Sequence, residues 1–276
     1  MQTEPTPDEK NLKRRRAVRK RVLFYGGFLA LLWGAYVWQP IEIDFIPRKV
    51  PPFVKVDPDS KHLFEKGTRV MVITAHPDDS EFYAAGTLLQ LAKSGAELHH
   101  LLLTDGDKAF YFWADNSALR FTRRTEQRTA SGKWNAREVR FLGYPDGRLR
   151  KNAETIAKTA AAIKEWNPEY ILCFDPNYPP RQSHQDHRRS GEIAFAAGQQ
   201  AGFKGWYLCF SSIAPNYAVD VDKVWSDRLD MIAIHASQFS GKKLEMIRGM
   251  FAESAANQGE PFGYSFAESY RAVQSP

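Results

Sequence analysis

The sequence predicts an α/β fold, a Rossmann-like, mostly parallel sheet with helices on both faces, plus one N-terminal transmembrane helix. From residue 69 onward, short apolar runs alternate with longer helical stretches, a pattern typical of βαβ units. Ahead of this region, residues 22–38 form an apolar run that no charge interrupts. A chain of 276 residues with 43% hydrophobic residues is long enough for one large domain and an appendage.

The expected strands and helices alternate along the chain. The strands are expected at 69–75, 98–104, 139–142, 170–174 and 206–211. The helices are expected at 81–93, 122–134, 153–166, 187–201, about 225–237 and about 241–257. In an open sheet of this kind, ligands bind beyond the carboxyl ends of the strands. Functional side chains are therefore expected directly after the strands.

Most of the net charge of +6 comes from the first residues of the chain. Residues 1–21 hold eight Lys and Arg and three acidic residues, whereas residues 22–276 hold 30 basic and 29 acidic residues. A nearly neutral body lacks the basic surface of a nucleic-acid-binding domain. We expect no nucleic-acid partner.

The apolar run over 22–38 has the length and flanks of a membrane anchor. Its 17 uncharged residues reach the lower limit for a spanning helix, and aromatic residues lie near its ends. Because the basic residues precede the run, the positive-inside rule places residues 1–21 in the cytoplasm. A cleaved signal peptide is the alternative, but the sequence from Tyr36 to Pro40 lacks the small residues of a cleavage site.

The first group of reactive side chains directly follows the strand at 69–75. His76, Asp78, Asp79 and Glu81 lie within six residues. Carboxylates this close repel one another unless a cation or hydrogen bonds compensate, and His nitrogen and Asp oxygen are both zinc ligands. The alternative is a solvated turn that caps the next helix.

A second group, His184, Asp186 and His187, follows the strand at 170–174 after a short loop. Alone, it is compatible with a surface loop. Together, both groups fall where an open α/β sheet places its site. A catalytic zinc uses three protein ligands and an open position for water, whose pKa it lowers, and a nearby carboxylate takes the proton. The two groups therefore indicate metal-assisted amide hydrolysis.

Several ordered segments resemble the PIG-L/LmbE-like zinc-dependent N-deacetylases. The segments are similar to the family's A-H-P-D-D-x-E-F, G-T-L, R-x-x-E-x-x-x-A, F-L-G-x-x-D-G, H-x-D-H and H-x-S-Q patterns, at residues 75–82, 86–88, 123–130, 141–147, 184–187 and 235–238. The likeness covers residues 69–270. One departure is Ala85-Gly86, where a common version of the family has two glycines.

The resemblance implies a metal site. His76, Asp79 and His187 would be the zinc ligands, and Asp78 would be the general base that activates the water. A His/Asp/His site also accepts other divalent metals, such as iron or cobalt.

The resemblance also implies roles around the substrate. His184 would stabilise the tetrahedral intermediate and protonate the departing amine, and Asp186 would orient the His184 imidazole. Arg123 would hold the substrate. Four further residues of the matching patterns are expected to be structural: Glu126, Asp146, His235 and Gln238.

The implied reaction is hydrolysis of the N-acetyl amide of an N-acetylglucosamine-containing glycan or glycolipid, which releases acetate and a free amine. A membrane anchor favours a substrate that is lipid-linked, or a polymer made at the membrane. Two alternatives stay open. One is a hydrolase of a non-sugar N-acyl amide, and the other is a membrane-tethered glycan-binding module with a degenerate site.

These expectations divide the chain into four parts. They are a basic cytoplasmic arm (1–21), a transmembrane anchor (22–38), a proline-rich tether (39–66) and a deacetylase catalytic domain (67–276). The prolines of the tether favour an extended chain. We expect a single-pass protein of the inner, cytoplasmic membrane, with its catalytic domain on the periplasmic or extracytoplasmic side.

Overall fold

The computed structural model describes residues 54–108, 117–178 and 184–276. The predicted arm, the predicted anchor at 22–38 and the first part of the tether lie outside the described residues. None of the helices in the described ranges is both long and apolar enough to cross a membrane.

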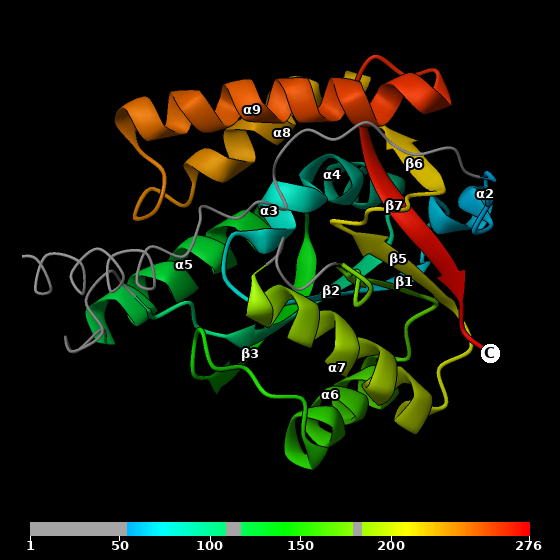
Figure 1. The fold of residues 1–276 in the computed structure, drawn as a ribbon, viewed down its shortest axis with the longest axis vertical. Helices are drawn as coiled ribbons and strands as arrows, with labels where there is room; N and C mark the ends of the chain where they lie inside the picture. Colours follow the sequence, from blue (N-terminus) through cyan, green and yellow to red (C-terminus); the bar gives the residue numbers. More distant parts are fainter. Residues whose placement is uncertain (1–53, 109–116, 179–183) are drawn as a thin grey trace, which may run out of the picture. The chain divides into compact units, whose positions relative to one another are not determined.

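Seven strands of the described chain form one sheet, in the order β3-β2-β1-β4-β5-β7-β6 (Figure 1). The strands are β1 Arg69–Thr74, β2 Glu97–Thr104, β3 Ala136–Tyr144, β4 Tyr170–Phe174, β5 Trp206–Phe210, β6 Tyr217–Asp220 and β7 Ala267–Gln274. The first five run parallel, whereas β7 is antiparallel to both β5 and β6. From β1 the chain adds β2 and then β3 on one side, and it returns to add β4 and then β5 on the other side of β1. A topological switch point therefore lies between β1 and β4.

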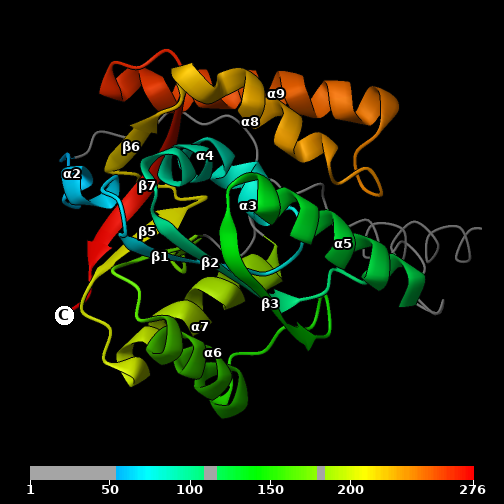
Figure 2. The same ribbon diagram turned by 180° about the vertical axis from the view of Figure 1, so that it is seen from behind.

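Helices cover both faces of the sheet, as the sequence predicts (Figures 1 and 2). The α-helices are α2 Ser60–Leu63, α3 Asp79–Tyr83, α4 Ala85–Ser94, α5 Ser117–Lys133, α6 Ala153–Trp166, α7 Gln185–Ala201, α8 Trp225–Ala233 and α9 Gly241–Gly259. Two 3-10 turns are η2 Asp222–Val224 and η3 Glu260–Phe262.

Side chains alternate along each strand and so supply two separate cores. Val70 and Val72 of β1 pack in the core shared with α4 and α5. Met71 and Ile73 of the same strand pack in the core shared with α6 and α7. Because both faces of the strand are buried, β1 is apolar along nearly its whole length.

The predicted fold class is confirmed for the sheet and its helices, and the bounds of α6 and β4 match the prediction residue for residue. One expected helix, 81–93, is wrong, because the chain breaks at Ala84 into α3 and α4. The break has a tertiary cause. The N–H groups of Gly86 and Thr87, in the first turn of α4, donate to the Glu268 carboxylate of β7 at 2.9 and 2.8 Å.

Two strands, β6 and β7, are absent from the sequence prediction. Residues 267–274 alternate apolar and polar side chains over part of their length, which is typical of a strand with one buried face. This signal was present in the sequence. The antiparallel direction of β7 was not, because it depends on how the chain returns after α9.

Candidate metal centre

The chain turns sharply between β1 and α3, and this turn carries one half of the site. Asp78 adopts φ 99° and ψ −23°, a left-handed conformation that is uncommon for a residue with a side chain. Its N–H donates to Gln127 Oε1 of α5 at 2.8 Å. The Asp79 carboxylate turns back and accepts the N–H groups of Ala75 and His76 at 2.9 and 2.7 Å. Side chains of the turn and of α5 therefore fix the path of the main chain.

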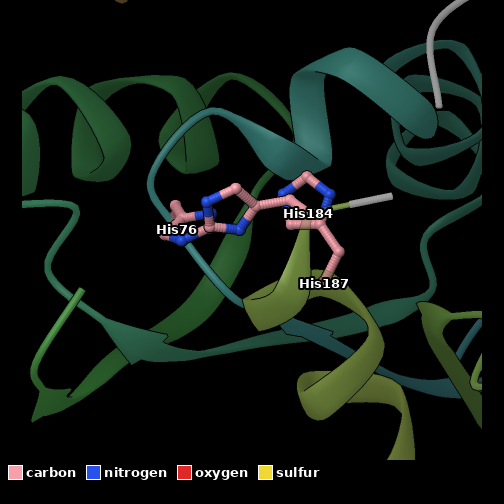
Figure 3. Close-up of side chains that lie close together, drawn as sticks. All are labelled: His76, His184 and His187. Atoms are coloured by element: carbon pink, nitrogen blue, oxygen red, sulfur yellow. The ribbon is translucent and has the colours of Figure 1, made fainter. Parts of the chain in front are cut away.

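The start of α7 carries the other half. His184 is the N-cap of this helix, and its Nδ1 accepts the N–H of Asp186 at 3.3 Å. Figure 3 shows His76 from the β1 turn beside His184 and His187. The ring centre of His76 lies 4.9 Å from that of His184 and 5.2 Å from that of His187. The fold thus brings the two sequence groups together at the switch point.

The three metal ligands implied by the resemblance meet around one carboxylate. Asp79 Oδ1 lies 3.2 Å from His187 Nε2, and Asp79 Oδ2 lies 3.7 Å from His76 Nδ1. The other nitrogen of the His76 ring, Nε2, lies 3.2 Å from Asp146 Oδ1 and 3.4 Å from Asp186 Oδ2. His76 is therefore surrounded by acidic groups.

This donor set fits a divalent metal. The imidazoles of His76, His184 and His187 bring ligand atoms within 4.8 Å of one another, and so do His76, Asp146 and Asp186. His76 Nε2 is buried and makes no hydrogen bond within the described ranges. A buried nitrogen in this state calls for an explanation. A cation bound between Nε2 and the carboxylates of Asp146 and Asp186 supplies one, whereas Asp79 faces the other ring nitrogen, Nδ1. The described residues therefore form a possible His/Asp metal site.

Opposite charges in the site shift one another's pKa. Burial works against a charge on His76, but Asp146, Asp186 and Asp79 raise the pKa of its imidazole well above the usual value. Burial likewise works against a charge on Asp79, but His187 and His76 hold the pKa of its carboxyl well below the usual value. The two pKa shifts are opposite in sign because a carboxylate and an imidazolium each favour the charged form of the other.

His184 behaves differently from the other two histidines. Burial and the neighbouring imidazoles of His76 and His187 together lower the pKa of His184 to about 3. Because Nδ1 accepts a main-chain N–H, the proton of the neutral ring belongs on Nε2. His184 can therefore donate a hydrogen bond from Nε2.

Asp78 lies between the metal site and Arg123. Burial raises the pKa of the Asp78 carboxyl, and the guanidinium of Arg123 partly opposes this effect. Arg123 Nη2 donates to Asp78 Oδ2 at 2.8 Å, and Nη1 donates to the carbonyl of Gly106 at 2.7 Å. A carboxylate with a raised pKa suits a general base. The structure thus gives Arg123 contacts to the Asp78 carboxylate and to main-chain oxygens.

Asp186 contacts the His184 imidazole through its main chain, and its carboxylate lies elsewhere. The Asp186 carboxylate accepts the N–H groups of Gly147 and Leu149 at 2.6 and 3.1 Å, and its contact with His184 runs through its own main chain. In the first turn of α7 the side chain of Asp186 faces the loop after β3. Asp186 therefore holds this loop, which carries Asp146, against His76.

Asp146 is the site residue that sequence analysis assigned to a structural role only. Its place beside His76 follows from the end of β3, which reaches the same edge of the sheet as the end of β1. The position after a strand was a usable signal. Glu126 has the expected internal contacts, since its carboxylate accepts the N–H and the hydroxyl of Ser237 at 2.7 and 2.6 Å.

The fold and the site define a class of protein: an α/β protein with a possible His/Asp metal site at the switch point of its sheet. Comparisons with known proteins narrow this class to a family. The family described as PIG-L, GlcNAc-PI de-N-acetylase, matches residues 71–198. This span includes both halves of the site. The chain is 26% identical over 239 residues to the diacetylchitobiose deacetylase of Thermococcus kodakarensis, which covers 79% of this chain and 88% of that one. This chain therefore carries a PIG-L family domain.

Solved structures agree on the fold. The N,N'-diacetylchitobiose deacetylase from Pyrococcus horikoshii, complexed with an inhibitor, has a TM-score of 0.71 at 24% identity, over 78% of this chain and 86% of that one. GalB, a 4-carboxy-2-hydroxymuconate hydratase from Pseudomonas putida, has a TM-score of 0.63 at 20% identity, over 76% of this chain and 97% of that one. Because proteins named for different reactions share this fold, the fold alone does not specify the reaction, and the residues of the site do.

Proposed function

We propose that this protein is a metal-dependent N-deacetylase that hydrolyses the N-acetyl amide of an N-acetylglucosamine-containing glycan or glycolipid. One observation carries the proposal: Asp79 joins His76 and His187 directly beside a partly buried Asp78, within the family match. The named activities of relatives support the substrate class. Besides the diacetylchitobiose deacetylase, the chain is 24% identical over 204 residues to a probable N-acetyl-alpha-D-glucosaminyl L-malate deacetylase 2 of Bacillus anthracis, over 65% of this chain and 85% of that one.

We take the metal to be zinc, held by His76, Asp79 and His187. When bound, such a metal acts as a Lewis acid toward the amide carbonyl and lowers the pKa of water. Asp79 suits this role because its two oxygens already face both histidines. The main-chain N–H groups at its own turn fix the carboxylate and support its orientation.

The side chains around the metal site account for the proton movements. Asp78 takes a proton from the water as the water oxygen attacks the carbonyl carbon of the acetyl group. His184 donates a hydrogen bond from Nε2 to the carbonyl oxygen as negative charge develops there. When the C–N bond breaks, the amine nitrogen takes the proton held by Asp78, and not one from His184 as the resemblance implies, because His184 uses its Nε2 proton at the carbonyl oxygen. Acetic acid leaves and ionises to acetate, which releases the second proton of the water. Arg123 keeps the Asp78 carboxylate in place.

The membrane attachment is proposed from the sequence. A single-pass anchor at 22–38 would keep the catalytic domain at an extracytoplasmic membrane surface, where a lipid-linked or polymeric amino sugar is accessible. Reporter fusions at the C-terminus test this topology. If a C-terminal reporter that works only in the cytoplasm is active, this topology is contradicted.

The test of the activity combines metal content with product release. The full chain is purified, its metal content is measured by elemental analysis, and amine release from N,N'-diacetylchitobiose is followed with and without a chelator. Near-stoichiometric zinc and chelator-sensitive amine release are expected, and Asp78→Asn is expected to keep the metal but lose turnover. Metal without amine release from any N-acetyl sugar would direct the search to other amides. A protein that binds no metal and shows no activity after zinc is added would contradict the proposal.

A further inference from the structure

A second group of buried polar side chains lies behind Asp78, away from the metal ligands. Its members have no role in the chemistry proposed above. Glu81, Gln127, Trp134 and His235 are all fully buried. A carboxylate in such a place is unfavourable unless donors surround it, so the arrangement of these donors indicates what the group is built to do.

The donors around Glu81 are complete on both oxygens. Glu81 Oε2 lies 3.0 Å from His235 Nε2 and accepts the Gln127 amide nitrogen at 3.1 Å and the Ser80 hydroxyl at 2.9 Å. Glu81 Oε1 accepts the indole N–H of Trp134 at 3.2 Å. The carboxylate is thus held by side chains from α3 and α5, from the residue after α5 and from the segment after α8.

Glu81 determines which way the Gln127 amide points. A carboxylate only accepts hydrogen bonds, so the NH₂ group of Gln127 has to face Glu81. Gln127 Oε1 therefore faces the opposite way, where it accepts the N–H of Asp78 at 2.8 Å. The two ends of one amide connect the buried carboxylate to the main chain of the residue with φ 99°.

We propose that Gln127 and Glu81 are positioning residues for the base. The line from His235 through Glu81 and Gln127 holds the main chain of Asp78 in its left-handed conformation, which aims the Asp78 carboxylate at the reacting water. Such conformations persist where the surroundings impose them, and they cluster at active sites. Arg123 donates a hydrogen bond to the carboxylate of Asp78, and Gln127 accepts one from its main-chain N–H. The inference rests on the proposed role of Asp78 as the base.

The test replaces Gln127 by leucine in the full chain, with N,N'-diacetylchitobiose as the substrate. Gln127→Leu is expected to lower kcat about 10²-fold, because displacement of a catalytic group by about 1 Å has effects of this size. KM and zinc content are expected to stay at wild-type values, since Gln127 touches neither a metal ligand nor substrate. The matched control is Ser131→Ala, which removes another hydrogen bond of Gln127, at 3.2 Å, and leaves the link to Asp78. This control is expected to keep wild-type kcat.

A double-mutant cycle separates a positioning role from a merely structural one. In the Asp78→Asn background, Gln127→Leu is expected to add no further loss of kcat, because groups that act as a unit are not additive. The same additional loss in both backgrounds overturns the inference. Wild-type kcat in Gln127→Leu also overturns it, while leaving the proposed function intact. Wild-type turnover in Asp78→Asn would instead overturn the proposed function itself.

A milder variant covers the case in which Gln127→Leu does not fold. Glu81→Gln keeps the size of the side chain, but an amide both donates and accepts, so it no longer fixes the orientation of Gln127. We expect kcat to fall about tenfold at unchanged KM and zinc content, less than the loss from misplacing the base outright. Wild-type kcat in a folded Glu81→Gln protein overturns the inference.

Discussion

Two buried charged clusters of this protein differ in what surrounds their carboxylates. Glu268 accepts the N–H groups of Gly86 and Thr87 and the Nε–H of Arg228 at 3.1 Å, and it joins β7 to α4 and α8. At the metal site, His76 Nε2 lies against two carboxylates without a hydrogen bond in the described chain. We call the cluster around Glu268 closed, because its carboxylate finds its donors within the chain, although the buried Nη1 of Arg228 has no hydrogen-bond partner among the described residues. We call the metal site open, because a buried imidazole nitrogen there faces carboxylates and has capacity for a ligand.

The largest expected effect is at the open cluster. His187→Ala removes a proposed ligand, so zinc content and deacetylase activity are expected to be lost, with turnover down by at least about 10³-fold. The free energy of unfolding of the metal-free protein is also expected to fall, because His187 is buried against Asp79 and Phe174. Elemental analysis, amine release and denaturant unfolding of the same preparation measure all three. A variant that retains zinc and wild-type turnover would show that His187 is no ligand.

The closed cluster is expected to give the reciprocal result. Glu268→Ala leaves the buried Arg228 without its carboxylate partner, and breaking such a pair costs about 3–5 kcal/mol of stability. Denaturant unfolding measures this loss. Zinc content and kcat of the folded fraction are expected to remain at wild-type values. Loss of metal from a folded Glu268→Ala protein would contradict the separation of a cluster that stabilises the fold from a cluster that binds metal.

A smaller effect links the fold to the metal site through α7. A Cβ at Gly191 would come within 2.4 Å of the carbonyl oxygen of Phe174, so this glycine lets α7 approach β4. Gly191→Ala is expected to cost about 1–3 kcal/mol through overpacking. It also shifts the helix that carries His184 and His187, so zinc affinity is expected to fall. Gly132→Ala, on α5 with nothing near the added Cβ, is the control. Equal zinc affinity in the two variants contradicts the expected link.

The smallest expected effect is far from both clusters and depends on pH. The carboxylates of Glu65 and Glu169 raise the pKa of His62 above 6.5. A raised folded pKa means that the stabilisation is complete below about pH 6.5 and is lost as the pH rises through the folded value. His62→Gln is therefore expected to lower Tm at pH 6 and to have less effect at pH 8.5, with a difference worth less than about 1 kcal/mol at this solvent-exposed position. An equal change in Tm at both pH values contradicts this account.

The sequence predicted the parts of the site that lie close together along the chain. His76, Asp78 and Asp79 follow a strand directly, and His184 and His187 begin a helix, so their places relative to the sheet could be inferred from local patterns. The position of Asp146 beside His76 was not inferred, although the end of β3 at the same edge contained the signal. The role of Gln127 was also not predicted, because Gln127 is not a defined position of the family pattern that includes its neighbour Glu126.

What the sequence alone determined is the order of the first five strands and of the helices between them, apart from the break at Ala84, the bounds of α6 and β4, and the two reactive groups at strand ends. These features depend on side-chain period and on helix ends, which involve residues a few positions apart. Only the tertiary structure decided that Glu268, 182 residues from Gly86, starts a new helix there. Only the tertiary structure decided that Gln127, 49 residues from Asp78, holds its main chain. Such contacts depend on how helices pack across the sheet, and no local pattern of residues specifies that packing.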